Sequence, residues 1–168
     1  MQLSYQQIGV LSDALTRLDG SRITKLVDGK PVDVFVSYHL AWSARWILAQ
    51  AQGKLQRAIA DFQSTRDVLI NHHSNGTGQI SAAHDNYKVF AGEFENLQRQ
   101  IVNLDIGQIT LDQLKLEANE KAGHEIPISI LAALQPLIKE PVVDTIRRDL
   151  EGARTAQAAL EETIARTQ

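Results

Sequence analysis

A seven-residue repeat of apolar residues constrains this chain more than any other feature of its sequence. Within residues 79–105 the apolar residues recur at alternating steps of three and four: Ile80, Ala83, Tyr87, Phe90, Phe94, Leu97, Ile101 and Leu104. Upstream, an apolar residue stands at every seventh position: Val34, Ala41, Leu48, Leu55, Phe62 and Leu69. Such spacing places the side chains on one face of a helix. Because only a short loop separates the two stretches, they predict a long antiparallel, coiled-coil-like helical hairpin.

The remainder of residues 1–139 predicts shorter elements around that hairpin, and the expected fold class is all-α. Ser4 and Gln7 have the spacing of a helical capping box, which predicts a first helix over residues 4–20. The dipeptide at 28–29, Asp-Gly, favours a tight turn, so a turn or a small hairpin is expected next. Asp33 is a suitable N-cap for the second helix. Short segments after residue 105 should then close one end of the domain.

A third apolar repeat begins at Pro141 and predicts a long C-terminal helical arm over residues 140–168. We expect six of its residues to mediate protein interaction: Val143, Ile146, Leu150, Gln157, Leu160 and Ile164. A polar residue such as Gln157 within an apolar stripe typically fixes the register or the number of partners of a coiled coil. The stripe therefore needs a partner, which is either the same arm of a second subunit or the hairpin of its own chain.

Composition excludes several kinds of partner. The formal net charge is -3 and the basic residues do not cluster, whereas a nucleic-acid surface needs grouped Lys and Arg. No apolar segment approaches the roughly 20 residues that span a bilayer, so no membrane partner is expected. The chain has no cysteine, which excludes disulfides and thiolate chemistry.

Aromatic residues crowd the region where the second helix is expected to begin. Phe35, Tyr38, Trp42 and Trp46 fall within little more than three helical turns. They have two interpretations. They could form a binding surface, because Trp and Tyr dominate interaction hot spots. The interpretation we prefer is that they pack on the first helix and close the end of the hairpin, and we keep Tyr38, Trp42 and Trp46 as candidate protein-interaction residues.

The sequence predicts no catalytic, cofactor or metal site. His72, His73 and His84 with Asp85 could be considered around a metal, but their spacing is not that of a known site. Gly76-Thr-Gly78 lacks the preceding strand and the following lysine of a phosphate-binding loop. The carboxylates fall on outward helical faces, where charge is ordinary solvation. We therefore expect a protein that is not an enzyme and needs no cofactor.

The layout from Phe35 onward resembles a family of small helical bacteriophage proteins of unknown function. The stretches that carry the resemblance are residues 55–70, Phe94-Glu-Asn-Leu97, Ile109-Thr-Leu111-Asp-Gln-Leu114 and residues 126–138. The match covers about residues 3–138, and the C-terminal arm has no counterpart in it. Such families are encoded among phage structural and tail genes, so the resemblance implies a role in the virion or in its assembly.

Two functions of different classes follow from these observations. The first is a phage structural or assembly protein that acts through helical self-association or packing in the virion, with itself or other phage proteins as partners. The alternative is a small helical inhibitor that binds a host protein, for instance one of antiphage defence. Either function places the protein in the host cytoplasm, and the first also places it in the virion.

Overall fold

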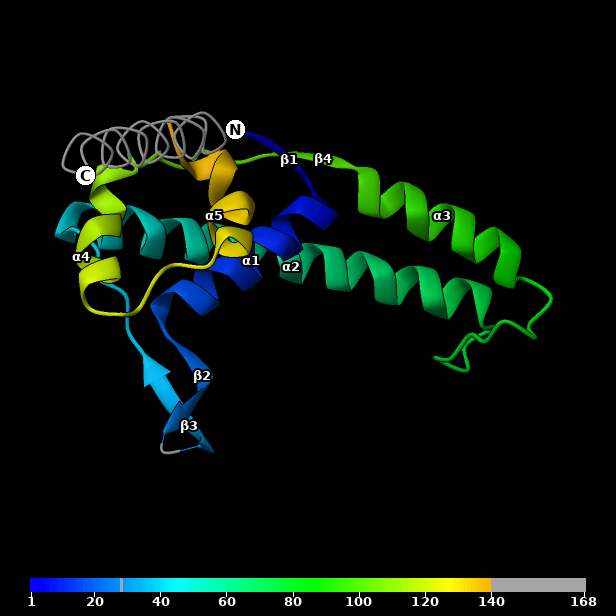
Figure 1. Ribbon diagram of the computed structural model, residues 1–168. Helices are drawn as coiled ribbons and strands as arrows, with labels where there is room; N and C mark the ends of the chain where they lie inside the picture. Colours follow the sequence, from blue (N-terminus) through cyan, green and yellow to red (C-terminus); the bar gives the residue numbers. More distant parts are fainter. Residues whose placement is uncertain (28, 140–168) are drawn as a thin grey trace, which may run out of the picture.

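The computed structural model describes residues 1–27 and 29–139, and this part of the chain is mostly helical (Figure 1). In chain order the elements are β1 (Gln2–Ser4), α1 (Tyr5–Asp19), β2 (Ser21–Val27), β3 (Lys30–Val36), α2 (Trp42–His73), α3 (Tyr87–Arg99), β4 (Ile101–Asn103), the 3-10 helix η1 (Asp112–Leu114), α4 (Leu116–Lys121), α5 (Ile128–Leu134) and the 3-10 helix η2 (Gln135–Leu137). None of the described helices combines the length and the apolar character that a membrane span requires.

The first helix begins where the capping box predicts. The Ser4 hydroxyl oxygen accepts a hydrogen bond from the Gln7 amide, and the Gln7 side-chain oxygen accepts one from the Ser4 amide. This reciprocal pair satisfies two amides that the first helical turn leaves free. One apolar face of α1 is then buried in the core, and its members are Ile8, Leu11, Ala14, Leu15 and Leu18.

The predicted small hairpin is confirmed, but it is longer than the sequence indicated. Strands β2 and β3 pair antiparallel from Ser21↔Val36 to Val27↔Lys30. Asp33 was expected to cap the second helix, and that prediction is wrong: it lies in β3, where its carboxylate accepts a hydrogen bond from the Thr24 hydroxyl at 2.8 Å. The structure is therefore not purely α-helical. This hairpin projects from the helical body (Figure 1).

The long helical hairpin that the apolar repeats predict is not observed with the expected bounds. Helix α2 spans 32 residues, but it begins at Trp42 rather than near residue 33. Helix α3 has only 13 residues, against the 27 positions of the predicted stretch at 79–105. Ile101, expected at the helical seam, lies instead in β4, which pairs antiparallel with β1. The backbone hydrogen bonds of this short ladder replace those that would have continued α3.

Helices α2 and α3 do contact each other near the far end of α2, where three phenylalanine rings meet. The Phe62 and Phe94 ring centroids are 6.0 Å apart, and Phe90 and Phe94 stack at 5.7 Å. All three side chains are only partly buried. Together with the loop that joins them, the second half of α2 and α3 form an extension, the two-helix arm, that projects away from the body (Figure 1).

The core lies in the body, around the first half of α2. Its buried face carries alternating small and large residues: Ala44, Leu48, Ala51, Leu55 and Ala58. The small side chains of these alanines allow α1 to approach α2 closely. Helix α5 also packs on α1. A parallel bridge between Ile109 and Ile138 closes this region. Helix α5 ends at Leu134, two residues before Pro136, which lies in η2.

Candidate protein-interaction surface

The aromatic cluster separates into a buried and an exposed part. Tyr38 is 3% exposed and belongs to the core, whereas Trp42 is 81% and Trp46 is 61% exposed. Phe35 is 65% exposed and its ring lies against the backbone of Gly20, at the end of α1. The preferred interpretation, that the tryptophans pack on the first helix, is therefore wrong for Trp42 and Trp46.

The two tryptophans share one side of the first turns of α2, because residues four apart in a helix are neighbours. Arg45 and Ala49 occupy the adjoining positions and are also exposed. We call these four residues the tryptophan face. Two large aromatic side chains exposed next to each other form a contiguous apolar patch, and such a patch often marks an interaction site.

The helix end that carries this face is held in place by the segment that follows β4. The Ala41 amide donates to the Gln113 carbonyl at 2.8 Å, and the Gln113 side-chain amide donates to the Ser43 hydroxyl oxygen at 2.7 Å. The Gln113 side-chain oxygen also accepts a hydrogen bond from the Thr110 amide at 2.8 Å. These bonds fix the start of α2 and the direction of the tryptophan face.

Asn119, which the sequence analysis did not single out, completes this support. Its side chain is fully buried in the short helix α4. The side-chain oxygen accepts from the His39 amide at 2.6 Å, and the side-chain nitrogen donates to the His39, Leu114 and Lys115 carbonyls. The only signal in the sequence is an amide residue between apolar segments, which is too common to be informative.

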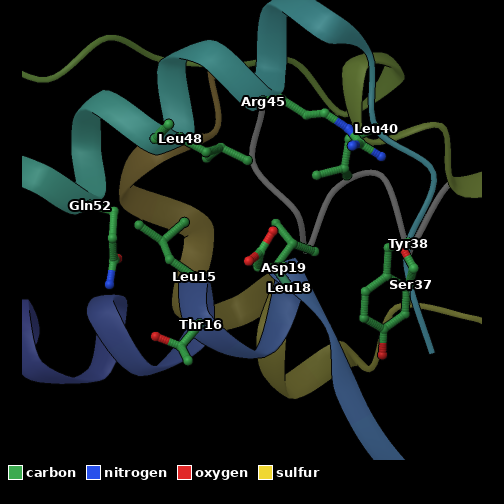
Figure 2. Close-up of a pocket in the computed structure, with 11 residues that line it drawn as sticks. Leu15, Thr16, Leu18, Asp19, Ser37, Tyr38, Leu40, Arg45, Leu48 and Gln52 are labelled. Carbon is green, nitrogen blue, oxygen red and sulfur yellow. The ribbon is translucent and has the colours of Figure 1, made fainter. Parts of the chain in front are cut away.

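A pocket of about 510 Å³ adjoins the tryptophan face. Eleven residues line it: Leu15, Thr16, Leu18, Asp19, Ser37, Tyr38, Leu40, Arg45, Leu48, Ala49 and Gln52. Side chains of α1 face side chains of α2 across it, and the segment after β3 closes one end (Figure 2). Arg45 and Ala49 belong to both the pocket and the tryptophan face, so the two features form one continuous surface.

The pocket brings opposite charges to an apolar wall. Neither the Arg45 guanidinium nor the Asp19 carboxylate has a hydrogen bond or an ion pair with any described residue. The Gln52 side-chain nitrogen lies 3.3 Å from the Ser12 hydroxyl oxygen, while its amide oxygen is buried without a partner. An apolar cavity with a few convergent polar groups has the general form of a binding site.

Among the described residues, the histidines considered as metal ligands do not form a cluster that could hold a metal ion. His73 is buried, and its Nε2 atom lies 2.9 Å from Oε2 of Glu93 on α3. His72 contacts only the edge of the His73 ring. Within residues 1–27 and 29–139 no group of three or more His, Asp or Glu side chains has the arrangement of a metal site. The His73–Glu93 contact joins α2 to α3 instead.

An exposed ion pair on α4 changes the pKa values of its two members but does not form a binding site. On α4 the Lys121 ammonium donates to the Glu117 carboxylate at 2.6 Å, one helical turn away. This bond and the lysine charge lower the pKa of Glu117, and the carboxylate raises the pKa of Lys121. Both groups are in full contact with water, so the pair is an ordinary helix-surface contact.

Of the nine residues predicted to mediate interaction, the structure brings Trp42 and Trp46 to one exposed face and buries Tyr38 below it. The other six, Val143, Ile146, Leu150, Gln157, Leu160 and Ile164, lie outside the described residues. No protein-family model matches the chain, and no curated protein or solved structure shows significant similarity to it.

Proposed function

We propose that the protein is a non-enzymatic bacteriophage structural or assembly protein that associates with a second copy of itself through the tryptophan face. The observation that carries this proposal is the exposure of both tryptophans, 81% and 61%, on one side of α2. A buried Trp contributes more contact area than almost any other residue, and such residues are concentrated at interaction hot spots. The resemblance to phage proteins supplies the assembly role.

Self-association fits the form of this surface. A twofold contact between two copies uses the same patch on both, so the two indole rings of one copy can pack on the two indole rings of the other. The faces of the two indole rings would bury apolar area against the other copy.

The test measures the molecular mass in solution and the tryptophan fluorescence. The fluorescence reports on the tryptophan face alone, since Trp42 and Trp46 are the two tryptophans of the whole chain. Sedimentation velocity of the full chain should show a dimer forming as concentration rises from roughly 1 to 100 µM, a range accessible to weak specific contacts. Emission should shift to the blue over the same range as the indoles leave water. Trp42→Ser and Trp46→Ser should each weaken the dimer.

The matched control is Val68→Ser, because Val68 is 66% exposed near the other end of α2 and lies outside the tryptophan face. This variant should dimerise like the unmodified chain. A full chain that stays monomeric at every concentration, with constant emission, would show self-association to be wrong. The alternative, an inhibitor of a host protein, then predicts that a host protein is retained by the unmodified chain and lost with either tryptophan variant.

A further inference from the structure

The pocket beside the tryptophan face has the composition of a site that a peptide segment fills. Its apolar wall comes from Leu15 and Leu18 of α1 with Leu40 and Leu48 on the opposite side. Its two charges, on Asp19 and Arg45, are unpaired within the described part of the chain. An occupant should therefore present apolar side chains together with both an acidic and a basic group.

The sequence after residue 139 has this chemistry. The apolar residues of the stripe, beginning with Val143, Ile146 and Leu150, alternate with charges of both signs. The charged residues among and beside them are Asp144, Arg147, Arg148, Asp149, Glu151 and Arg154. A segment of this kind can bury its apolar residues on the leucine wall while a carboxylate meets Arg45 and a guanidinium meets Asp19.

The described structure also shows where this segment starts. The Lys139 amide donates to the Ile109 carbonyl at 2.9 Å, next to the bridge between Ile109 and Ile138. The preceding helix α5 packs on α1, which supplies one wall of the pocket. From that anchor the chain continues for the 29 residues 140–168. A tethered segment has an effective concentration of about millimolar, far above that of a second molecule in dilute solution.

We infer that residues 141–168 dock on the pocket of their own chain, with a few of their apolar side chains against the leucine wall and charges of the segment paired with Arg45 and Asp19. The pocket is then an intramolecular docking site that shares Arg45 and Ala49 with the tryptophan face, while Trp42 and Trp46 stay free for the dimer contact. The inference stands on the lining of the pocket, its unpaired charges and the anchor at Lys139, and it holds whether or not the protein dimerises.

The test measures proximity in the full chain, which has no cysteine of its own and carries its two tryptophans on the same helical turns as the pocket residue Arg45. A Thr155→Cys variant is labelled with a nitroxide, which quenches nearby indoles, and reduction of the nitroxide gives the unquenched reference. The label should remove most of the Trp42 and Trp46 emission. The control is Gln79→Cys, whose exposed site follows the far end of α2 and should leave the emission unchanged.

Two further measurements identify the site and the source of the segment. Arg45→Glu should restore the emission of the labelled chain, whereas Arg57→Glu, an exposed arginine of α2 outside the pocket, should not. Quenching should be independent of protein concentration. Equal emission from the two labelled variants, or quenching unaffected by Arg45→Glu, would overturn the inference. Quenching that grows with concentration would also overturn it, because the segment would then come from a second copy.

Discussion

The buried side chain of Asn119 helps to position the tryptophan face, which lies on a different helix. Its amide group joins the segment before α2 to the turn between η1 and α4 through hydrogen bonds to His39, Leu114 and Lys115. Because the side chain is fully buried, water cannot replace these bonds when it is removed. The residue therefore matters for the start of α2, and through it for the direction of the tryptophan face.

We expect Asn119→Ala to lower the free energy of unfolding by about 3 kcal/mol, the upper range for leaving buried polar groups unpaired. Urea unfolding followed by circular dichroism measures the change. The control is Asn96→Ala on the exposed surface of α3, which should stay within about 0.5 kcal/mol of the unmodified chain. Equal effects of the two substitutions would show that the Asn119 bonds contribute nothing specific.

At the scale of elements, helix α2 belongs to two different environments along its length. Its first half lies in the core against α1, and Leu55 there is fully buried. Its second half packs mainly on α3, where Phe62, Phe90 and Phe94 remain partly exposed, and touches α1 only through the Tyr5 ring, 5.1 Å from that of Phe62. The heptad spacing assigned Leu55 and Phe94 to one seam, but burial differs between them because α3 is short and lies beside one half of α2 alone.

This difference predicts unequal costs of truncation. Leu55→Ala should lower the free energy of unfolding by about 4 kcal/mol, within the range for a buried Leu whose removal leaves a cavity. Phe94→Ala should lower it by about 1 to 2 kcal/mol, because a ring in contact with water loses less apolar burial. Both are measured by urea unfolding. A cost for Phe94→Ala as large as that for Leu55→Ala would mean that the two-helix arm has a core of its own.

At the scale of the whole molecule, stability is concentrated in the body. The largest fully buried side chains of the described chain come from α1, α2, β3 and the segments after β4. In the body they are Ile8, Leu11, Leu18, Val36, Leu55, Ile109, Leu114, Asn119, Ile130, Leu134 and Leu137, and the remaining one, Ser74, directly follows α2 in the two-helix arm. In α3 only Leu97 is buried. A region with few buried contacts opens at lower free energy than the core does.

Hydrogen exchange should therefore resolve two levels of protection. We expect amides of α1 and of the first half of α2 to exchange slowly, near the rate set by global unfolding, and amides of α3 to exchange faster. Mass spectrometry of exchanged peptides measures both in one experiment. Residues 87–99 exchanging as slowly as residues 5–19 would contradict the division into a body and a two-helix arm.

Several features of the fold follow from interactions between residues that are close together in the chain, so they can be predicted from the sequence. The capping box at Ser4 and Gln7, the turn after β2 and the end of α5 before Pro136 follow from local hydrogen bonding and backbone geometry. The seven-residue apolar spacing likewise placed Leu48 and Leu55 on one face of α2, and both residues are buried. These rules act over one or two turns of chain, so they need no knowledge of the rest of the molecule.

The ends of other elements and the exposure of each aromatic residue depend on contacts with distant segments of the chain, so they could not be predicted from the sequence. Ile101 continues the helical spacing, yet it lies in β4 because β1, about a hundred residues earlier, offers backbone partners there. Tyr38 and Trp42 belong to one aromatic cluster in the sequence, but the first is buried and the second exposed. Periodicity assigns a side chain to a face of an element, whereas burial depends on which distant segments reach that face.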